Sequence, residues 1–308
     1  MITYVVTDLF QSPARVLVNT VNTVGVMGAG IAKEFKRIYP DMFTQYQTIC
    51  EREQLDIGQL WLYKTSHKWI INFPTKKHWR QPSRPQYIEA GLKKFQEIFA
   101  EQGITSISFP LLGCGNGELD WETQVKPIME RYLKPIPIEA FIHLHRRDPF
   151  VPEHRHPDII KAWLRSEPES LPFAEVWDDL LTKIREEGTF KFLDSTETFT
   201  AKATISPQDG IEIEVAGGSV FVAKDALFDV WQHLRGFGFC MERHMPSGLD
   251  RYTRYIVALM ATLSYLKPVL LSRDYSKVTR KAVGLQLLPR ARKPEGPLFA
   301  HTKILEPA

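Results

Sequence analysis

The sequence predicts an α/β fold, with a mixed, largely parallel sheet between helices, followed by a second, α+β domain. Short apolar runs typical of strands alternate with helical patterns through about the first 145 residues, which is the order of a largely parallel sheet. Two of these runs lead into glycine-rich loops, at 19–31 and 110–117, and a helical pattern follows each loop. The chain has 308 residues, which is enough for two domains that each bury a core.

The elements of the first domain follow from the period of the apolar residues. Strands are predicted at 2–7, 15–20, 59–63, 68–73, 104–109 and 138–143, and helices at 29–38, 41–53, 86–102 and 121–133. In a parallel sheet, ligands bind beyond the carboxyl ends of the strands, and both glycine-rich loops are expected at that edge.

A stretch with three prolines and no periodicity, residues 145–158, marks the domain junction. We therefore expect a first domain at 1–145, a linker at 146–157 and a second domain at 158–308. The three histidines of this stretch have no metal-site spacing, and no metal is expected. In the second domain, helices are predicted at 158–165, 173–187, 227–234 and 250–265, strands at 190–192, 198–206, 210–215 and 218–223, and an irregular tail at 289–308.

The first glycine-rich loop has the order that binds a diphosphate. A buried strand, Val16-Leu17-Val18, delivers Asn19 and Asn22 to its end, three glycines follow at 25, 28 and 30, and a helix then begins. Glycines let the backbone approach phosphate oxygens, and a helix N-terminus offers unpaired N–H groups. The spacing matches neither the dinucleotide fingerprint nor the ATP P-loop.

The second loop, Pro110-Leu-Leu-Gly-Cys-Gly-Asn-Gly117, repeats this arrangement, so the two loops could hold one diphosphate from both sides. Together with Thr7-Asp8-Leu9, Val18-Asn19-Thr20-Val21-Asn22 and Gly28-Ala29-Gly30-Ile31-Ala32, it resembles the macrodomain family, whose members bind ADP-ribose. The four motifs stand in family order over roughly 145 residues.

The stretch Asn72-Phe-Pro-Thr-Lys-Lys-His-Trp79 narrows the resemblance. It is similar to the lysine-bearing strand end of glycohydrolases that remove ADP-ribose from glutamate and from DNA bases. Within them the chain resembles the DarG antitoxins, which reverse DNA ADP-ribosylation by DarT toxins. This resemblance implies ADP-ribosylated single-stranded DNA as substrate, a DarT-like DNA ADP-ribosyltransferase toxin as partner of the second domain, and no cofactor.

Lys76 is the catalytic residue that the resemblance implies. A deprotonated Lys76 could attack C1″ of the distal ribose or its ring-opened aldehyde, whereas a protonated one could stabilise charge on the departing base. A third possibility is a lysine that only holds phosphate. Related enzymes pair the lysine with an aspartate after the GCG motif, but Gly117 stands there, with Glu118 and Asp120 shifted along the chain.

The resemblance places Asp8 on the adenine amine and Asn22 on the distal ribose. The alternatives are a turn or helix-capping role for Asp8 and a loop-bracing role for Asn22. The full set of expected ADP-ribose contacts is Asp8, Leu9, Asn19, Asn22, Gly28, Gly30, Ile31, Thr75, Leu112, Gly113, Cys114, Gly115, Asn116 and Gly117. The expected DNA contacts are Lys77, His78, Trp79 and Arg80, although Trp79 could instead be a core residue.

Charge is unevenly distributed along the chain. Residues 156–230 hold 15 Asp and Glu against 7 Lys and Arg, and residues 231–308 hold 5 against 13. An acidic surface could occupy the basic groove of a DNA-modifying toxin, whereas the basic stretch could bind DNA. Rival functions for the whole chain are an ADP-ribose reader and a hydrolase of ester-linked ADP-ribose on protein or O-acetyl-ADP-ribose.

The remaining features fit a reduced, cytoplasmic protein. Its three cysteines are widely spaced without a CxxC pattern, and no signal peptide or membrane-spanning stretch is expected.

Overall fold

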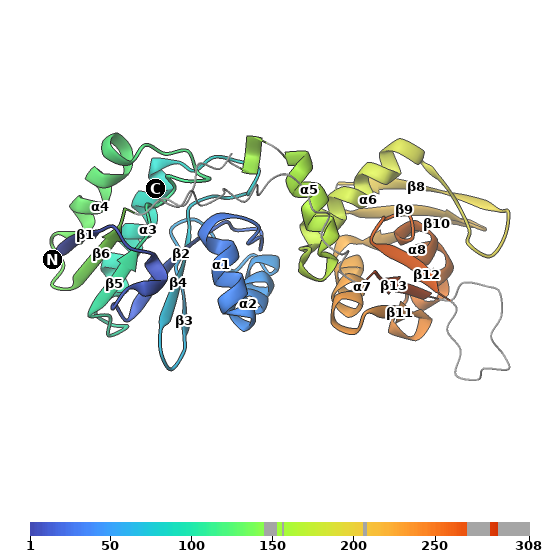
Figure 1. The fold of residues 1–308 in the computed structure, drawn as a ribbon. Coiled ribbons are helices and arrows are strands. Elements are labelled where there is room, and N and C mark those ends of the chain that lie inside the picture. The colour runs from blue at the N-terminus through green and yellow to red at the C-terminus, as the bar shows by residue number, and fades with distance from the viewer. Residues whose placement is uncertain (145–152, 156, 206–207, 270–283, 289–308) are drawn as a thin grey trace, which may run out of the picture. The chain divides into compact units, whose positions relative to one another are not determined.

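The computed structural model describes residues 1–144, 153–155, 157–205, 208–269 and 284–288 (Figure 1). The chain divides into two compact units, Met1–Lys161 and Ala162–Ala308. Most of the predicted linker, 146–157, and the whole tail, 289–308, lie outside the described residues, so the predicted domain limits stay a prediction.

A six-stranded sheet forms the centre of the first unit. Its order is β1-β6-β5-β2-β4-β3, and every neighbouring pair is parallel except β4 and β3. The strands are β1 (Ile2–Val5), β2 (Val16–Val21), β3 (Trp61–Lys64), β4 (Trp69–Pro74), β5 (Ser106–Phe109) and β6 (Glu139–His143). This topology confirms the predicted mixed, largely parallel sheet, and it brings the ends of β2, β4 and β5 to one edge.

Helices cover both faces of this sheet and bury a core on each. One core packs α1 (Gly30–Ile38) and α2 (Pro40–Glu51) through Phe35, Met42 and Tyr46. The other packs α3 (Pro85–Ile98) and α4 (Lys126–Leu133) through Leu92, Phe95 and Met129. The helices therefore lie on opposite sides of the sheet, as predicted (Figure 1).

The helix predicted at 121–133 is not continuous. A π-helical turn, Trp121–Val125, precedes α4. Pro127 has no N–H group to donate to the preceding turn, so the α-helical hydrogen-bond ladder starts again after it.

The described residues of the second unit form two antiparallel sheets. One has the order β10-β9-β8-β7 and the other the order β11-β13-β12. The strands are β7 (Thr189–Lys191), β8 (Thr198–Thr204), β9 (Gly210–Val215), β10 (Gly218–Ala223), β11 (Phe239–Met241), β12 (Leu266–Val269) and β13 (Gly284–Leu287). The α-helices are α6 (Phe173–Glu187), α7 (Lys224–Phe237) and α8 (Thr253–Met260), and α5 (Pro157–Ser166) spans the boundary between the units. Short 3-10 helices lie at Leu9–Gln11, Glu153–Arg155, Pro168–Ser170, Glu242–His244 and Asp250–Tyr252.

The predicted helix 250–265 is too long, and the three-stranded sheet was not predicted. Helix α8 ends at Met260, and Leu266–Val269 pairs with Gly284–Leu287 instead. These strands have three or four residues and pair over long separations, so the local pattern does not reveal them. Among the described residues, no helix has the length and apolarity needed to cross a membrane.

Candidate functional site

The first glycine-rich loop connects β2 to α1, and Asn22 braces it. The buried Asn22 Oδ1 accepts hydrogen bonds from the N–H groups of Val24 (3.1 Å) and Val26 (3.2 Å), and Nδ2 donates to the Val26 carbonyl oxygen (2.7 Å). The Tyr46 hydroxyl donates to the Asn22 carbonyl oxygen at 2.7 Å. Burial raises the pKa of Tyr46 well above its ordinary value, so this donor keeps its proton. Asn22 therefore braces the loop, and its expected contact with the distal ribose stays a prediction.

The loop ends at the N-terminus of α1. Gly25 and Gly30 have φ values of +80° and +56°, which favour glycine. Ala29 caps the helix without a side-chain hydrogen bond, so the N-cap residue leaves the first N–H groups of α1 unsatisfied. Such N–H groups can donate hydrogen bonds to phosphate oxygens.

The second glycine-rich loop leaves no room for a side chain at position 117. A Cβ atom on Gly117 would lie 2.2 Å from Ser83 Oγ and 2.3 Å from the Gly113 carbonyl oxygen. Gly113 itself has φ +69°. A side chain here, such as the aspartate that the resemblance leads one to expect, would therefore require the loops to move apart.

Glu118, the next residue, is paired with two basic side chains. His154 Nε2 lies 2.8 Å from the carboxylate, and Arg155 makes an ion pair with it. The hydrogen bond with His154, followed by the charge of Arg155, lowers the pKa of Glu118. An ionised, paired carboxylate is a poor general acid.

The loop that carries Lys76, residues 75–84, lies between the two glycine-rich loops and is bonded to both. Toward the first loop, the Lys77 carbonyl oxygen accepts hydrogen bonds from the Thr23 N–H (3.2 Å) and hydroxyl (2.7 Å). Toward the second loop, the Ser83 N–H donates to the Gly117 carbonyl oxygen at 3.0 Å. The Thr75 N–H extends the β2–β4 pairing by donating to Val21 at 2.9 Å.

Lys76 itself completes this connection. The residue is only 6% exposed, and its Nζ donates a hydrogen bond to the Asn116 carbonyl oxygen at 2.7 Å. The structure thus brings together Lys76 and the second glycine-rich loop, as the sequence predicted.

Of the four residues expected to contact DNA, Trp79 is buried and not on the surface. Its ring is fully buried, and the Arg80 guanidinium lies 4.6 Å from the ring centroid. The Arg80 N–H also donates to His78 Nδ1 at 3.1 Å. Trp79 is thus a core residue that supports the loop, whereas Lys77 is exposed.

Asp8 and Leu9 lie after β1, at the same edge of the sheet. Asp8 caps the short helix Leu9–Gln11, and its Oδ1 accepts a hydrogen bond from the Phe10 N–H at 3.0 Å. Leu9 and Leu112 are buried, and Ile31 is half-buried. The capping alternative for Asp8 is therefore present, although the carboxylate is also partly exposed.

Several buried polar atoms around these loops lack a hydrogen-bond partner among the described residues. Asn19 Nδ2 donates to Asn72 Oδ1 at 2.9 Å, but Asn19 Oδ1 and Asn72 Nδ2 have no partner. Ser83 Oγ and Asn116 Oδ1 are also buried without a hydrogen-bond partner. Unpaired buried polar atoms are rare in proteins, and a cluster of them is typical of a site that takes a ligand or water.

Sequence reasoning missed Ser83, Tyr46 and Asn72 as parts of this site. Asn72 begins the lysine-bearing motif, so its position offered a signal. Ser83 and Tyr46 belong to no motif, and only the folded chain shows their contacts.

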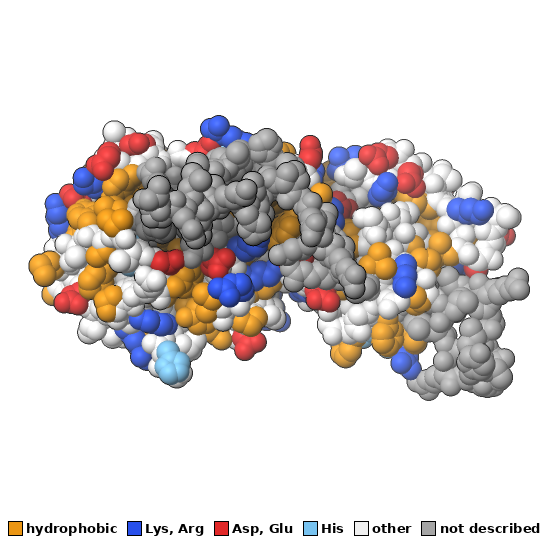
Figure 2. Space-filling view, in the orientation of Figure 1, with side chains coloured by type: hydrophobic (Ala, Val, Ile, Leu, Met, Phe, Trp, Pro, Cys, Tyr) orange, Lys and Arg blue, Asp and Glu red, His pale blue; other side chains and the backbone are white. Residues whose placement is uncertain are grey.

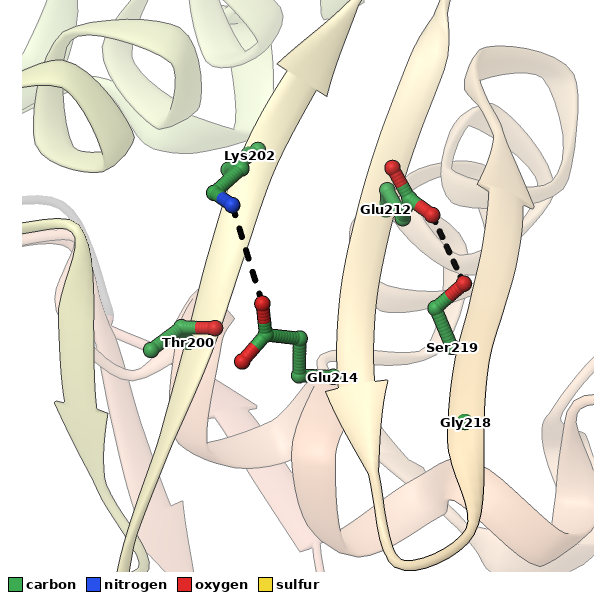
Figure 3. A pocket seen from close by; sticks show the side chains of 6 residues that line it. All are labelled: Thr200, Lys202, Glu212, Glu214, Gly218 and Ser219. Atoms are coloured by element: carbon green, nitrogen blue, oxygen red, sulfur yellow. Dashed lines mark hydrogen bonds and ion pairs between the residues drawn. The ribbon is translucent and has the colours of Figure 1, made fainter.

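An open hollow of about 390 Å³ lies on the face of β8, β9 and β10 in the second unit (Figure 3). Lys202 lies 3.6 Å from Glu214, and Ser219 donates to Glu212 at 2.6 Å. Four of the lining side chains thus pair with one another. Within the described part of the chain, no three His, Cys, Asp or Glu side chains gather as metal ligands would.

Known proteins resemble the first unit. The Macro domain family model matches residues 18–128. A DNA ADP-ribosyl glycohydrolase of Mycobacterium tuberculosis is 46% identical over 147 residues, which cover 46% of this chain and 42% of that protein. A DNA ADP-ribosyl transferase-DNA ADP-ribosyl glycohydrolase fusion protein of Thermosipho africanus is 37% identical, covering 47% of this chain and 42% of the fusion. The ADP-ribose glycohydrolase OARD1 of Bos taurus is 30% identical over 145 residues, which cover 46% of this chain and 90% of that protein. The chain thus matches less than half the length of the two bacterial relatives.

Proposed function

Because the chain belongs to the macrodomain family, we propose that its first unit is a glycohydrolase that releases ADP-ribose from DNA bases. The observation that carries this proposal is the lysine loop, which is hydrogen-bonded to both glycine-rich loops. That arrangement holds a cationic side chain beside the loops that would bind the diphosphate. The names of the two bacterial relatives support DNA as the carrier of the ADP-ribosyl group.

In this proposal the ADP-ribose lies along the edge formed by β1, β5, β2 and β4. The Asp8 carboxylate accepts a hydrogen bond from the adenine amine, and the N–H groups of both loops and of α1 bind the diphosphate. Asn22 shapes the loop beneath the distal ribose. Lys77, His78 and Arg80 contact the DNA strand, with Trp79 as the buried support of their loop.

Hydrolysis replaces the bond from C1″ to the base nitrogen with a bond from C1″ to a water oxygen, and the departing nitrogen takes up a proton. The Lys76 Nζ donates to a carbonyl oxygen, which is a contact that the ammonium form makes well. We therefore favour a protonated Lys76 that stabilises charge on the departing base over a covalent attack by the amine. The exclusion of a side chain at Gly117 supports a single-lysine scheme.

The test is Lys76→Ala in the full-length chain, with Lys77→Ala as a matched control on an ADP-ribosylated mononucleotide. We expect Lys76→Ala to lose roughly 100-fold or more in turnover while ADP-ribose affinity stays within a few-fold. Loss of affinity together with turnover would make Lys76 a phosphate ligand. Absence of hydrolysis by the wild-type protein, with intact ADP-ribose binding, would identify a reader. Faster hydrolysis of ester-linked ADP-ribose than of modified DNA would identify the other rival.

We further propose that the second unit binds a DNA ADP-ribosyltransferase toxin. The fusion of transferase and glycohydrolase in the Thermosipho relative supports this pairing. The acidic composition of residues 156–230 suits a toxin with a basic DNA groove. Part of this charge is used within the unit, since Arg165 pairs with Asp179 at 2.6 Å and with Glu175 at 3.3 Å.

This second proposal is tested with full-length Lys76→Ala protein and the transferase. We expect salt-sensitive binding and inhibition of the transferase without hydrolysis. Tight binding to single-stranded DNA with no effect on the transferase would contradict the proposal.

A further inference from the structure

Four aromatic rings form a continuous row at the junction of α7 and β11. Phe237 stacks on His233 with ring centroids 4.6 Å apart and an interplanar angle of 25°. The His233 and His244 rings lie 4.2 Å apart, and the Phe239 and His244 rings 5.9 Å apart. We call Phe237, His233, His244 and Phe239 the aromatic row.

Both ends of the aromatic row are open to solvent. Phe237 is 70% exposed and Phe239 is 36% exposed, which is unusual for phenylalanine. Burial lowers the pKa of His233, and burial together with His233 and Arg243 lowers the pKa of His244. Both imidazoles are therefore neutral at neutral pH and can pack ring against ring.

The sheet register continues this surface across three strands. Phe239 of β11 pairs with Gln286 of β13, and Gln286 pairs with Lys267 of β12. Side chains of paired residues lie on the same face of a sheet, so Phe239, Gln286 and Lys267 form one row. Their chain neighbours Cys240 and Leu285 are buried on the opposite face.

Basic groups accompany the exposed rings. Arg243 Nε donates to His244 Nε2 at 2.9 Å, which places a guanidinium beside the aromatic row, and Lys267 is exposed. The described residues 231–269 and 284–288 are also basic on balance, with 5 Lys and Arg against 2 Asp and Glu. Figure 2 shows hydrophobic side chains with basic ones beside them over α7 and β11.

We propose that the aromatic row, with Arg243 and Lys267, is a binding surface for single-stranded nucleic acid in the second unit. Exposed rings on a sheet face stack on unpaired bases, and neighbouring cations contact the backbone phosphates. A protein with a basic groove is the less suitable partner, because the cations of this surface would repel it. The surface is separate from the proposed glycohydrolase site, and the inference does not depend on hydrolysis.

Its consequence is a second contact with a DNA strand. If one strand can reach both units at once, binding to the first unit raises the effective concentration of the strand at the second. The overall affinity then exceeds that of either contact alone.

The test measures binding of a fluorescently labelled, unmodified oligodeoxythymidylate to the full-length protein by anisotropy. We expect wild-type binding that weakens with salt, and roughly 5- to 100-fold weaker binding for Phe239→Ala and for Phe237→Ala, as loss of one stacked base predicts. Lys267 is exposed, so Lys267→Glu reverses a charge on the same surface without removing a ring. This variant should also bind the oligonucleotide more weakly.

The matched control is Phe221→Ala, because Phe221 is 43% exposed in the other sheet of the same unit and pairs with Glu212. It should bind like wild type, and every variant should keep wild-type affinity for ADP-ribose. The proposal is overturned if the wild-type protein does not bind the oligonucleotide, or if the aromatic-row variants bind it within twofold of wild type. It is also overturned if Phe221→Ala weakens oligonucleotide binding as much as the aromatic-row variants do. It is equally overturned if those variants lose binding to a protein partner while DNA binding is unchanged.

Discussion

Substitution of Gly117 by alanine tests whether the contact between the lysine loop and the second glycine-rich loop shapes the ligand site. The new Cβ would stand 2.2 Å from Ser83 Oγ and 2.3 Å from the Gly113 carbonyl oxygen, about 1 Å inside normal contact distances. The loops must therefore separate by a comparable amount. Overpacking of this kind costs about 1–3 kcal/mol of folding free energy.

The effect on ligand binding follows from the same displacement. A shift of about 1 Å would break the alignment of loop N–H groups with a diphosphate, and each hydrogen bond to a charged group contributes about 1.5–3 kcal/mol. We expect ADP-ribose affinity, measured by calorimetry, to fall roughly 10- to 150-fold for the loss of one such bond. The melting temperature should fall by roughly 2–12 °C, taking about 2–4 °C per kcal/mol for a unit of this size.

Gly103→Ala is the control for destabilisation alone. Gly103 has φ +68° and no atom within 4 Å of its added Cβ, so an alanine there strains the backbone away from the site. It should lower the melting temperature without changing ADP-ribose affinity. If Gly117→Ala keeps its affinity within twofold while it is destabilised, the second loop does not bind the diphosphate and the reasoning is refuted.

Three further results are expected. Tyr46→Phe removes the hydroxyl that bonds to Asn22, so the unfolding free energy should fall by about 1 kcal/mol with weaker ADP-ribose binding, and unchanged values in both assays would contradict the bracing role. Trp79→Ala should cost about 3–5 kcal/mol in chemical denaturation because the ring is fully buried; an unchanged midpoint with weaker DNA binding would instead place the ring on DNA. The folded-state pKa of Glu118 is lowered by His154, so its contribution to stability is present above the unfolded pKa of about 4.3 and is lost as pH falls through the folded value. Glu118→Gln should remove that part of the pH dependence of unfolding, and an unchanged profile would show that the contact contributes nothing.

The sequence predicted the first unit well because its strands and loops are local patterns. The run Val16–Val18 and the glycines after it specify a buried strand, a loop and a helix within a short stretch, and the observed β2 and α1 confirm that order. The sheet β11-β13-β12 depends on pairings such as Leu266 with Leu287, which no local period encodes. The side-chain roles at the site were harder still. The shape of the Asn22 loop depends on a tyrosine 24 positions away, and the burial of Trp79 depends on how the whole loop folds back.

The contacts of the lysine loop limit which chemistry the site can perform. Gly117, next to the Asn116 that accepts from Lys76, leaves no room for a side chain unless the loops move, and Glu118 is already paired with His154 and Arg155. An ionised, paired Glu118 is a poor general acid, so in the proposed reaction protonation of the departing base would fall to Lys76, to the substrate or to solvent. A protonated Lys76 can serve the departing base without a second protein group, whereas a deprotonated nucleophile needs a partner to take its proton. The steric exclusion at position 117 therefore favours the electrostatic role of Lys76, and it makes the chemistry depend on how firmly Asn116 and Thr23 hold the lysine loop in place.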